Sequence, residues 1–145
     1  MSAASNHLES ALGTYLLRTA YPAKPTELWV SLYLFYSLPG EDNVDGYEVA
    51  TTSFGLPTGY GRVQYGPGDA YWVESSVTPG QFYNVAPITF GAPLYGWGTI
   101  TGFALYDSVT GGSVWMKGFL SQQVTISMGD PPLTFAPGAL VINFL

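Results

Sequence analysis

The pattern of apolar and polar positions divides the chain into a short helical start and a long β-rich remainder. Close to the N-terminus, apolar residues recur at the spacing of one helix face, at Leu8, Leu12, Tyr15 and Leu16. Asn6 is followed three residues later by Glu9, which resembles a capping box and predicts Asn6 as the N-cap. Pro22 and Pro25 end the helical pattern.

This predicted helix fits two roles: it packs on the rest of the domain, or it is an arm that docks on a neighbouring subunit. Gly13 weakens the helix, since glycine costs about 1 kcal/mol relative to alanine in a helix interior, and this favours dependence on a docking surface. The chain then divides into an N-terminal helix and link (residues 1–25) and a β domain (residues 26–145). The candidate subunit-interface residues are Leu8, Leu12, Tyr15 and Leu16.

Beyond the helix, the pattern changes to alternation or to unbroken apolar runs, as in strands. Leu28–Tyr36 (LWVSLYLFY) is the strongest candidate, and its near-continuous apolarity predicts burial on both faces. Thr99–Tyr106 and Ser113–Ser121 are predicted to form a hairpin across DSVTGG. Shorter candidates are 47–52, 60–65, 71–77, 82–90, 124–128, 133–135 and 140–144. About eight or nine strands at this spacing predict an all-β fold, a β-sandwich of jelly-roll type with a short N-terminal α-helix.

Composition favours assembly over a free monomer. Of the 145 residues, 47% are hydrophobic and 10% are charged, whereas a soluble domain is typically about 25% charged. A chain of this length forms one domain, and we expect part of its apolar surface to stay exposed for partners. The four cationic side chains are too few for a phosphate backbone or an anionic membrane, so neither nucleic acid nor membrane is an expected partner.

The sequence offers no recognisable catalytic constellation. With no cysteine, it has neither disulfides nor thiolate metal ligands. His7 is the single histidine, and we interpret it as a solvated residue near the helix start. Glu41–Gly46 approaches the spacing of a calcium-binding loop but lacks the final glutamate, so an acidic turn is favoured over a weak calcium site. Glu74 is predicted in a strand as a partner for Arg62. We therefore expect no enzyme activity, no cofactor and no metal.

The aromatic residues leave two interpretations open. Tyrosine and tryptophan anchor cores and protein interfaces, and their rings also stack on sugars. The candidate exposed aromatic contacts are Tyr71, Trp72, Tyr95 and Trp97. No stretch has the length of a membrane span, and no secretory signal precedes the helix, so we expect synthesis in a cytoplasm.

The order of elements resembles a family of small phage virion proteins, which includes capsid decoration (cement) proteins and so-called tail fibre or minor structural proteins. The motifs that carry this resemblance are SNHLESALGTYLLRTAY at 5–21, PAKPTELWVSLYLF at 22–35, GYGRV at 59–63, NVAPITF at 84–90, WGTIT at 97–101, GFALYDSVTGGSVWMKGFL at 102–120, GD at 129–130 and FAPGAL at 135–140. The second half, from Trp97, is the more specific part. The aromatic Gly/Pro region from Gly55 to Gly80 departs from the family pattern.

This resemblance implies a location and partners. It implies a non-enzymatic protein, made in the host cytoplasm, that sits on the capsid exterior of the virion. There it would form a homotrimer, bind the major capsid protein and stabilise the shell. The alternative is a tail fibre or receptor-binding component that contacts host-surface glycans.

Overall fold

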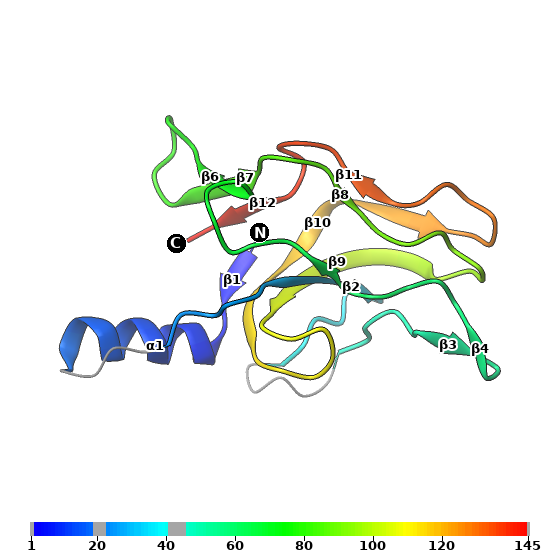
Figure 1. Ribbon diagram of the computed structural model, residues 1–145, viewed down its shortest axis with the longest axis horizontal. Helices are drawn as coiled ribbons and strands as arrows, with labels where there is room; N and C mark the ends of the chain where they lie inside the picture. The colour runs from blue at the N-terminus through cyan, green and yellow to red at the C-terminus, as the bar shows by residue number, and fades with distance from the viewer. Residues whose placement is uncertain (1, 19–22, 41–45, 145) are drawn as a thin grey trace.

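The computed structural model describes residues 2–18, 23–40 and 46–144, and in this part of the chain it is mostly β with one helix (Figure 1). This confirms the predicted all-β class with a short N-terminal helix. The predicted helix stop at Pro22 and residues 41–45 of the proposed calcium loop lie outside the described residues.

One five-stranded antiparallel sheet forms the centre of the molecule. Its order is β1-β10-β9-β2-β5. The strands are β1 (Ser2–Ala4), β10 (Val114–Ile126), β9 (Gly98–Tyr106), β2 (Trp29–Leu34) and β5 (Val63–Gln64). The four middle residues of β2 are buried, as the apolar run predicts, because both faces of the sheet are covered at this strand.

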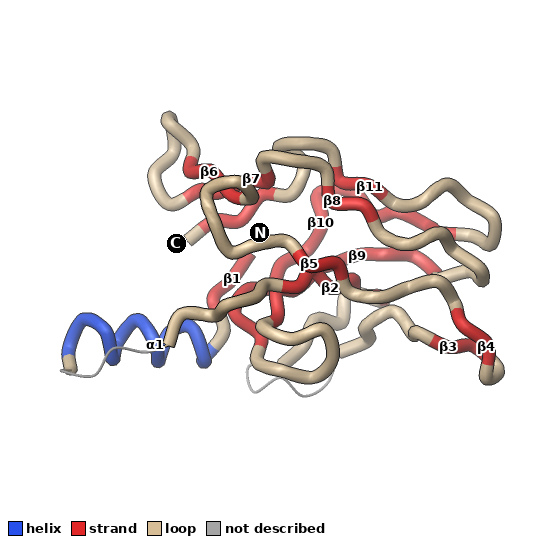
Figure 2. Tube along the Cα trace, viewed as in Figure 1, coloured by secondary structure: helices blue, strands red, loops and turns tan. Residues whose placement is uncertain are grey.

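Several small sheets lie beside the central one (Figure 2). They are β12-β7-β6, with β6 (Trp72–Glu74), β7 (Gln81–Asn84) and β12 (Val141–Asn143); β11-β8, with β8 (Ile88–Thr89) and β11 (Thr134–Phe135); and the hairpin β3 (Thr52–Ser53) with β4 (Leu56–Pro57). Because these strands are only two to four residues long and are split among separate sheets, the jelly-roll type stays a prediction.

The main core lies between the central sheet and the small sheets. Leu32, Ile100 and Phe103 come from the central sheet, and Ile88 and Ile142 come from the small ones. Burying each such side chain stabilises the fold by roughly 1.5–3 kcal/mol. A smaller cluster on the opposite face contains Tyr33, Ala104, Tyr106 and Val114.

The start of the chain differs from its prediction. The helix α1 (Asn6–Leu17) has Ser5, not Asn6, as its N-cap: the Ser5 hydroxyl accepts a hydrogen bond from the Leu8 amide at 3.2 Å. The physical reason is β1, which pairs with β10 and continues to Ser5, whose amide donates to the Trp115 carbonyl at 3.1 Å. Ser5 is therefore held extended and fully buried before the helix begins.

Other segment boundaries also shift. The segments predicted at 113–121 and 124–128 form one strand, β10, with an irregularity in its register between Phe119 and Val124. The segment predicted at 82–90 divides into β7 and β8 on either side of Pro87. The segment predicted at 47–52 contributes a single bridge between Glu48 and Tyr33 and the start of β3.

Candidate functional site: an apolar arm and an apolar groove

Helix α1 projects from the body of the molecule (Figure 1). None of its residues is buried. Three of the four candidate interface residues are exposed, Leu12 at 47%, Tyr15 at 56% and Leu16 at 73%, and Leu17 follows at 86%. A 12-residue helix is only marginally stable alone in water, so an arm of this length with an exposed apolar stripe is suited to a partner surface.

The root of the arm rests on β10. The ring of His7 packs edge-on against Trp115 with their centroids 4.5 Å apart. Leu8, the fourth candidate interface residue, is partly buried against the main core. His7 is exposed at the helix start, as expected for a solvated residue, and its ring contact with Trp115 adds packing that was not expected.

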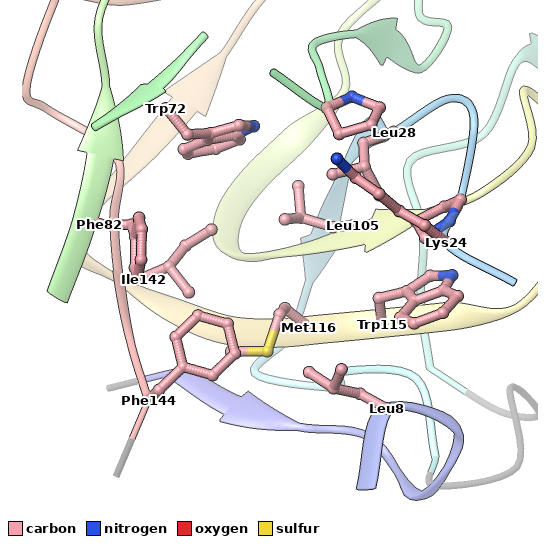
Figure 3. Close-up of a pocket in the computed structure, with 12 residues that line it drawn as sticks. Leu8, Lys24, Leu28, Trp72, Phe82, Leu105, Trp115, Met116, Ile142 and Phe144 are labelled. Carbon is pink, nitrogen blue, oxygen red and sulfur yellow. The ribbon is translucent and has the colours of Figure 1, made fainter. Parts of the chain in front are cut away.

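An apolar groove of about 360 Å³ opens beside this root (Figure 3). Leu8 lies on one side of the groove and Trp72 on the other, with Leu105 and Met116 between them. Lys24 is the one charged residue among the described side chains that line the groove. The full lining is Leu8, Lys24, Pro25, Leu28, Pro67, Trp72, Phe82, Leu105, Trp115, Met116, Ile142 and Phe144. Such a surface can bury an apolar side chain, but it presents no acid–base pair for catalysis.

A network of hydrogen-bonded polar groups surrounds Arg62. Its guanidinium forms a two-pronged pair with the Glu48 carboxylate, with both N–O distances at 2.9 Å. It also donates to the carbonyls of Ser108 and Gly111, at 2.9 and 2.8 Å. The prediction that Glu74 pairs with Arg62 is wrong, because Glu74 lies in β6 and accepts from the Gly80 amide instead.

Tyrosines extend this cluster into the interior. The Arg62 guanidinium lies 3.7 Å from the centroid of the Tyr106 ring, and the hydroxyls of Tyr106 and Tyr33 are 2.6 Å apart. The Tyr60 hydroxyl donates to Glu48 at 2.8 Å. Burial raises the pKa of Tyr33, Tyr60 and Tyr106, so these phenols stay neutral.

Because its polar atoms are paired within the chain, the Arg62 cluster serves the fold. Arg62 binds the 107–112 connection of the β9–β10 hairpin to the sheet through the Ser108 and Gly111 carbonyls. Among the described residues, no buried side-chain nitrogen or oxygen lacks a hydrogen-bond partner.

The predicted aromatic contacts fall in different environments. Tyr71 is 40% exposed and Tyr95 is half-buried. Trp72 lines the groove, and its indole N–H donates to the Tyr65 carbonyl at 3.2 Å. For Trp97 the prediction of an exposed contact is wrong: it is 4% exposed in the core, and its indole N–H donates to the Thr58 carbonyl at 2.9 Å.

Sequence reasoning missed the aromatic residues that are most exposed. Phe35, Tyr36 and Phe54 are exposed by 72%, 62% and 102%. In the described chain they are also the non-glycine residues with positive φ, at 57°, 52° and 50°. This conformation costs a residue other than glycine roughly 1–2 kcal/mol. These residues are exposed because of the local geometry of their turns. The pattern of hydrophobic residues along the chain does not predict that geometry.

The described residues also bear on metal binding and on membrane insertion. No group of three or more His, Asp and Glu side chains is placed to hold a metal ion there. In the same part of the chain, no helix has the length and apolar character to cross a membrane.

A β-rich body with an apolar arm and groove defines a small structural module, and comparison with known families places this module in the phage virion. The chain belongs to the family described as podophage GP4 fiber I protein gp80, whose model matches residues 3–143. This confirms the resemblance to small phage virion structural proteins. No curated protein matches the chain.

Proposed function

We propose that the protein is a non-enzymatic fibre component of the virion, held in place by α1 docking on another virion protein. The observation that carries this proposal is the arm, whose apolar residues Leu12, Tyr15 and Leu16 are exposed in the isolated chain. The family description favours a fibre. The full pairing of the Arg62 cluster supports a role without catalysis.

Docking of α1 can be tested in phage that carry Leu12→Asp and Leu16→Asp together. We expect purified virions to lose most of this protein, because two carboxylates on the apolar stripe would have to be desolvated at the interface. The matched control is Ser10→Asp, which places a carboxylate on the same helix at an exposed polar position. Equal incorporation of both variants would overturn the docking role of α1.

A capsid decoration protein is the second candidate. Low charge and an apolar arm equally suit a trimer that clamps major capsid protein subunits on the shell exterior, since many modest contacts act together. Copy number distinguishes the two, and a quantitative gel of purified virions measures it. Hundreds of copies per particle would support decoration, and a few to some tens would support the fibre.

Contact with host-surface glycans belongs to the fibre proposal. The half-exposed Tyr71 remains a candidate for it, and the exposed rings of Phe35, Tyr36 and Tyr47 add another aromatic surface. A glycan array tests the contact directly. Binding that is lost in Tyr36→Ala and kept in Tyr71→Ala would assign it to the second surface, and an array without signal would argue against glycan binding.

A further inference from the structure

The molecule carries two separate apolar surfaces, a tip and the apolar groove. The tip is the β3–β4 hairpin, where Phe54 is 102% exposed and Leu56 is 50% exposed. The groove lies among β6, β12, β10 and the root of α1 (Figure 3), and Figure 1 shows these elements away from the β3–β4 hairpin. These two surfaces cannot meet within one chain.

Phe54 occupies a position that the isolated chain does not favour. It and Gly55 are the central residues of the hairpin turn, and both have positive φ. Two-residue turns of this kind prefer Asn-Gly, because asparagine tolerates the left-handed conformation better than phenylalanine. Because the ring is fully exposed, no contact of its side chain within the chain compensates for the cost of this conformation.

The other two aromatic residues with positive φ differ from Phe54 in this respect. The ring of Phe35 contacts Tyr47 with a centroid distance of 5.5 Å, and that of Tyr36 contacts Phe119 at 5.7 Å. Their side chains therefore have partners on the surface of the same molecule. Of these three residues, Phe54 is the one that is fully exposed, so any partner of its ring would come from another molecule.

Shape and charge restrict this partner. A ring at the tip of a hairpin is convex, so it fits a concave surface better than an extended glycan. The residues of β3 and β4 beside it are uncharged: Thr52, Ser53, Leu56 and Pro57. An apolar pocket is therefore a suitable partner surface, and this chain itself has one, the groove, in which Lys24 is the one charged residue of the described lining.

We infer that Phe54 of one copy inserts into the groove of a second copy, so that the chains associate head to tail. An apolar cavity of about 150 Å³ already accommodates a benzene ring, and the groove measures about 360 Å³. Trp72, Phe82 and Phe144 would surround the ring with aromatic edges, and Lys24 at the groove is placed for a cation–π contact.

Head-to-tail contact has a geometric consequence. Two different surfaces meet, so the assembly closes into a ring if the rotation between copies allows it and otherwise grows as a filament. A ring of three would be the homotrimer that the family resemblance implies. The inference does not depend on whether the protein serves a fibre or the shell.

The first test compares the full-length wild type with Phe54→Asn by analytical ultracentrifugation over a wide concentration range. We expect the wild type to self-associate and Phe54→Asn to bind itself at least tenfold more weakly. Because Asn-Gly suits the turn, the variant should melt at the same or a higher temperature, so lost association would not reflect lost folding. Val77→Asn, which changes another exposed apolar loop residue, should associate like the wild type.

The decisive test mixes two variants. Phe144→Asp places a charge at the groove, where Phe144 is 44% exposed, and leaves the tip intact. Each variant alone should be monomeric. An equimolar mixture with Phe54→Asn should form a dimer of one copy each, because it combines one intact tip with one intact groove.

Three outcomes would overturn the inference: a wild type that stays monomeric throughout, Phe54→Asn that associates like the wild type, or a mixture that remains monomeric. If the wild type associates and Phe54→Asn does not weaken it, the copies use another surface. None of these results depends on virion incorporation, so they are separable from the failure of α1 docking.

Discussion

The interior around Arg62 and the projecting arm α1 differ in which kind of side chain finds a partner within the chain. Around Arg62, charged and phenolic groups are packed tightly, and each has a partner within the chain. Along α1, apolar side chains face water and none is buried. In the described part of the chain, the buried polar side chains therefore have partners, while part of the apolar surface faces water. Since buried polar contacts specify the fold and exposed apolar patches mark partners, function is expected at the arm, the groove and the hairpin tip.

The largest effect should come from breaking the interior. Arg62→Met takes the cationic partner from the Glu48 carboxylate, which keeps only the Tyr60 hydroxyl as a donor, and it removes the Arg62 donor from two carbonyls. Removal of one partner from a buried pair costs about 3–5 kcal/mol. We expect the lower part of this range because the Glu48 side chain is 26% exposed. Urea unfolding measures the loss.

Two comparisons sharpen this prediction. Adding Glu48→Gln to Arg62→Met should recover part of the stability, since it removes the unpaired carboxylate. Arg18→Met, at the exposed C-cap of α1, should change stability by less than about 0.5 kcal/mol. Equal losses for Arg18→Met and Arg62→Met would remove the distinction between interior and arm.

The junction between the two regions should give the next largest effect. Ser5→Ala removes the N-cap of α1 and the donor to the Val114 carbonyl, at a cost of about 1–2 kcal/mol. Both helix content, from circular dichroism, and global stability should fall. Ser10→Ala changes an exposed serine of the same helix and should have little effect. A drop in helix content with unchanged stability would mean that the arm is independent of the sheet.

High pH should weaken the interior in a defined direction. Tyr33, Tyr60 and Tyr106 have raised pKa values in the folded state, whereas unfolded tyrosines ionise near 10.0. The unfolded state therefore loses protons first as pH rises, and the free energy of unfolding falls above about pH 10. Tyr33→Phe should make this fall shallower in unfolding curves measured between pH 8 and 11. Parallel curves for the two proteins would contradict the assignment.

The smallest effect concerns the arm itself. A Cβ added at Gly13 would meet nothing within 4 Å, so Gly13→Ala should stabilise α1 by up to about 1 kcal/mol. Circular dichroism of the full chain should show more helix. Incorporation into virions tests whether the glycine serves a close contact there. A normal level would mean that the partner tolerates a methyl group at this position.

Sequence patterns were informative where burial is continuous. Leu28–Tyr36 is almost entirely apolar, and its part Trp29–Leu34 forms β2, whereas Phe35 and Tyr36 at its predicted end are exposed and lie outside the strand. DSVTGG joins β9 to β10 as predicted. The strand Ser2–Ala4 was missed, because three small residues carry no periodic signal and are ordered by β10. The arm residues Leu12, Tyr15 and Leu16 are exposed, which fits a docking arm, although docking itself stays a prediction.

Long-range contacts explain the remaining misses. The fold brings Arg62 to Glu48, and the spacing of the two residues in the sequence does not predict this pair. Trp97 and Phe54 are both aromatic residues next to glycine, yet the first is buried and the second fully exposed. The difference comes from what packs over each turn, and that information is not local.

The link between Ser5 and β10 also bears on mechanics. Tension at the N-terminal end of a docked α1 reaches the sheet through Ser5, whose amide and hydroxyl donate to the neighbouring carbonyls of Trp115 and Val114. Behind this point, β1 adds three residues of backbone pairing. A load on this end of α1 would therefore peel a short strand from a sheet edge. The helix would stay attached even then, because α1 is followed in the chain by β2, an inner strand of the same sheet.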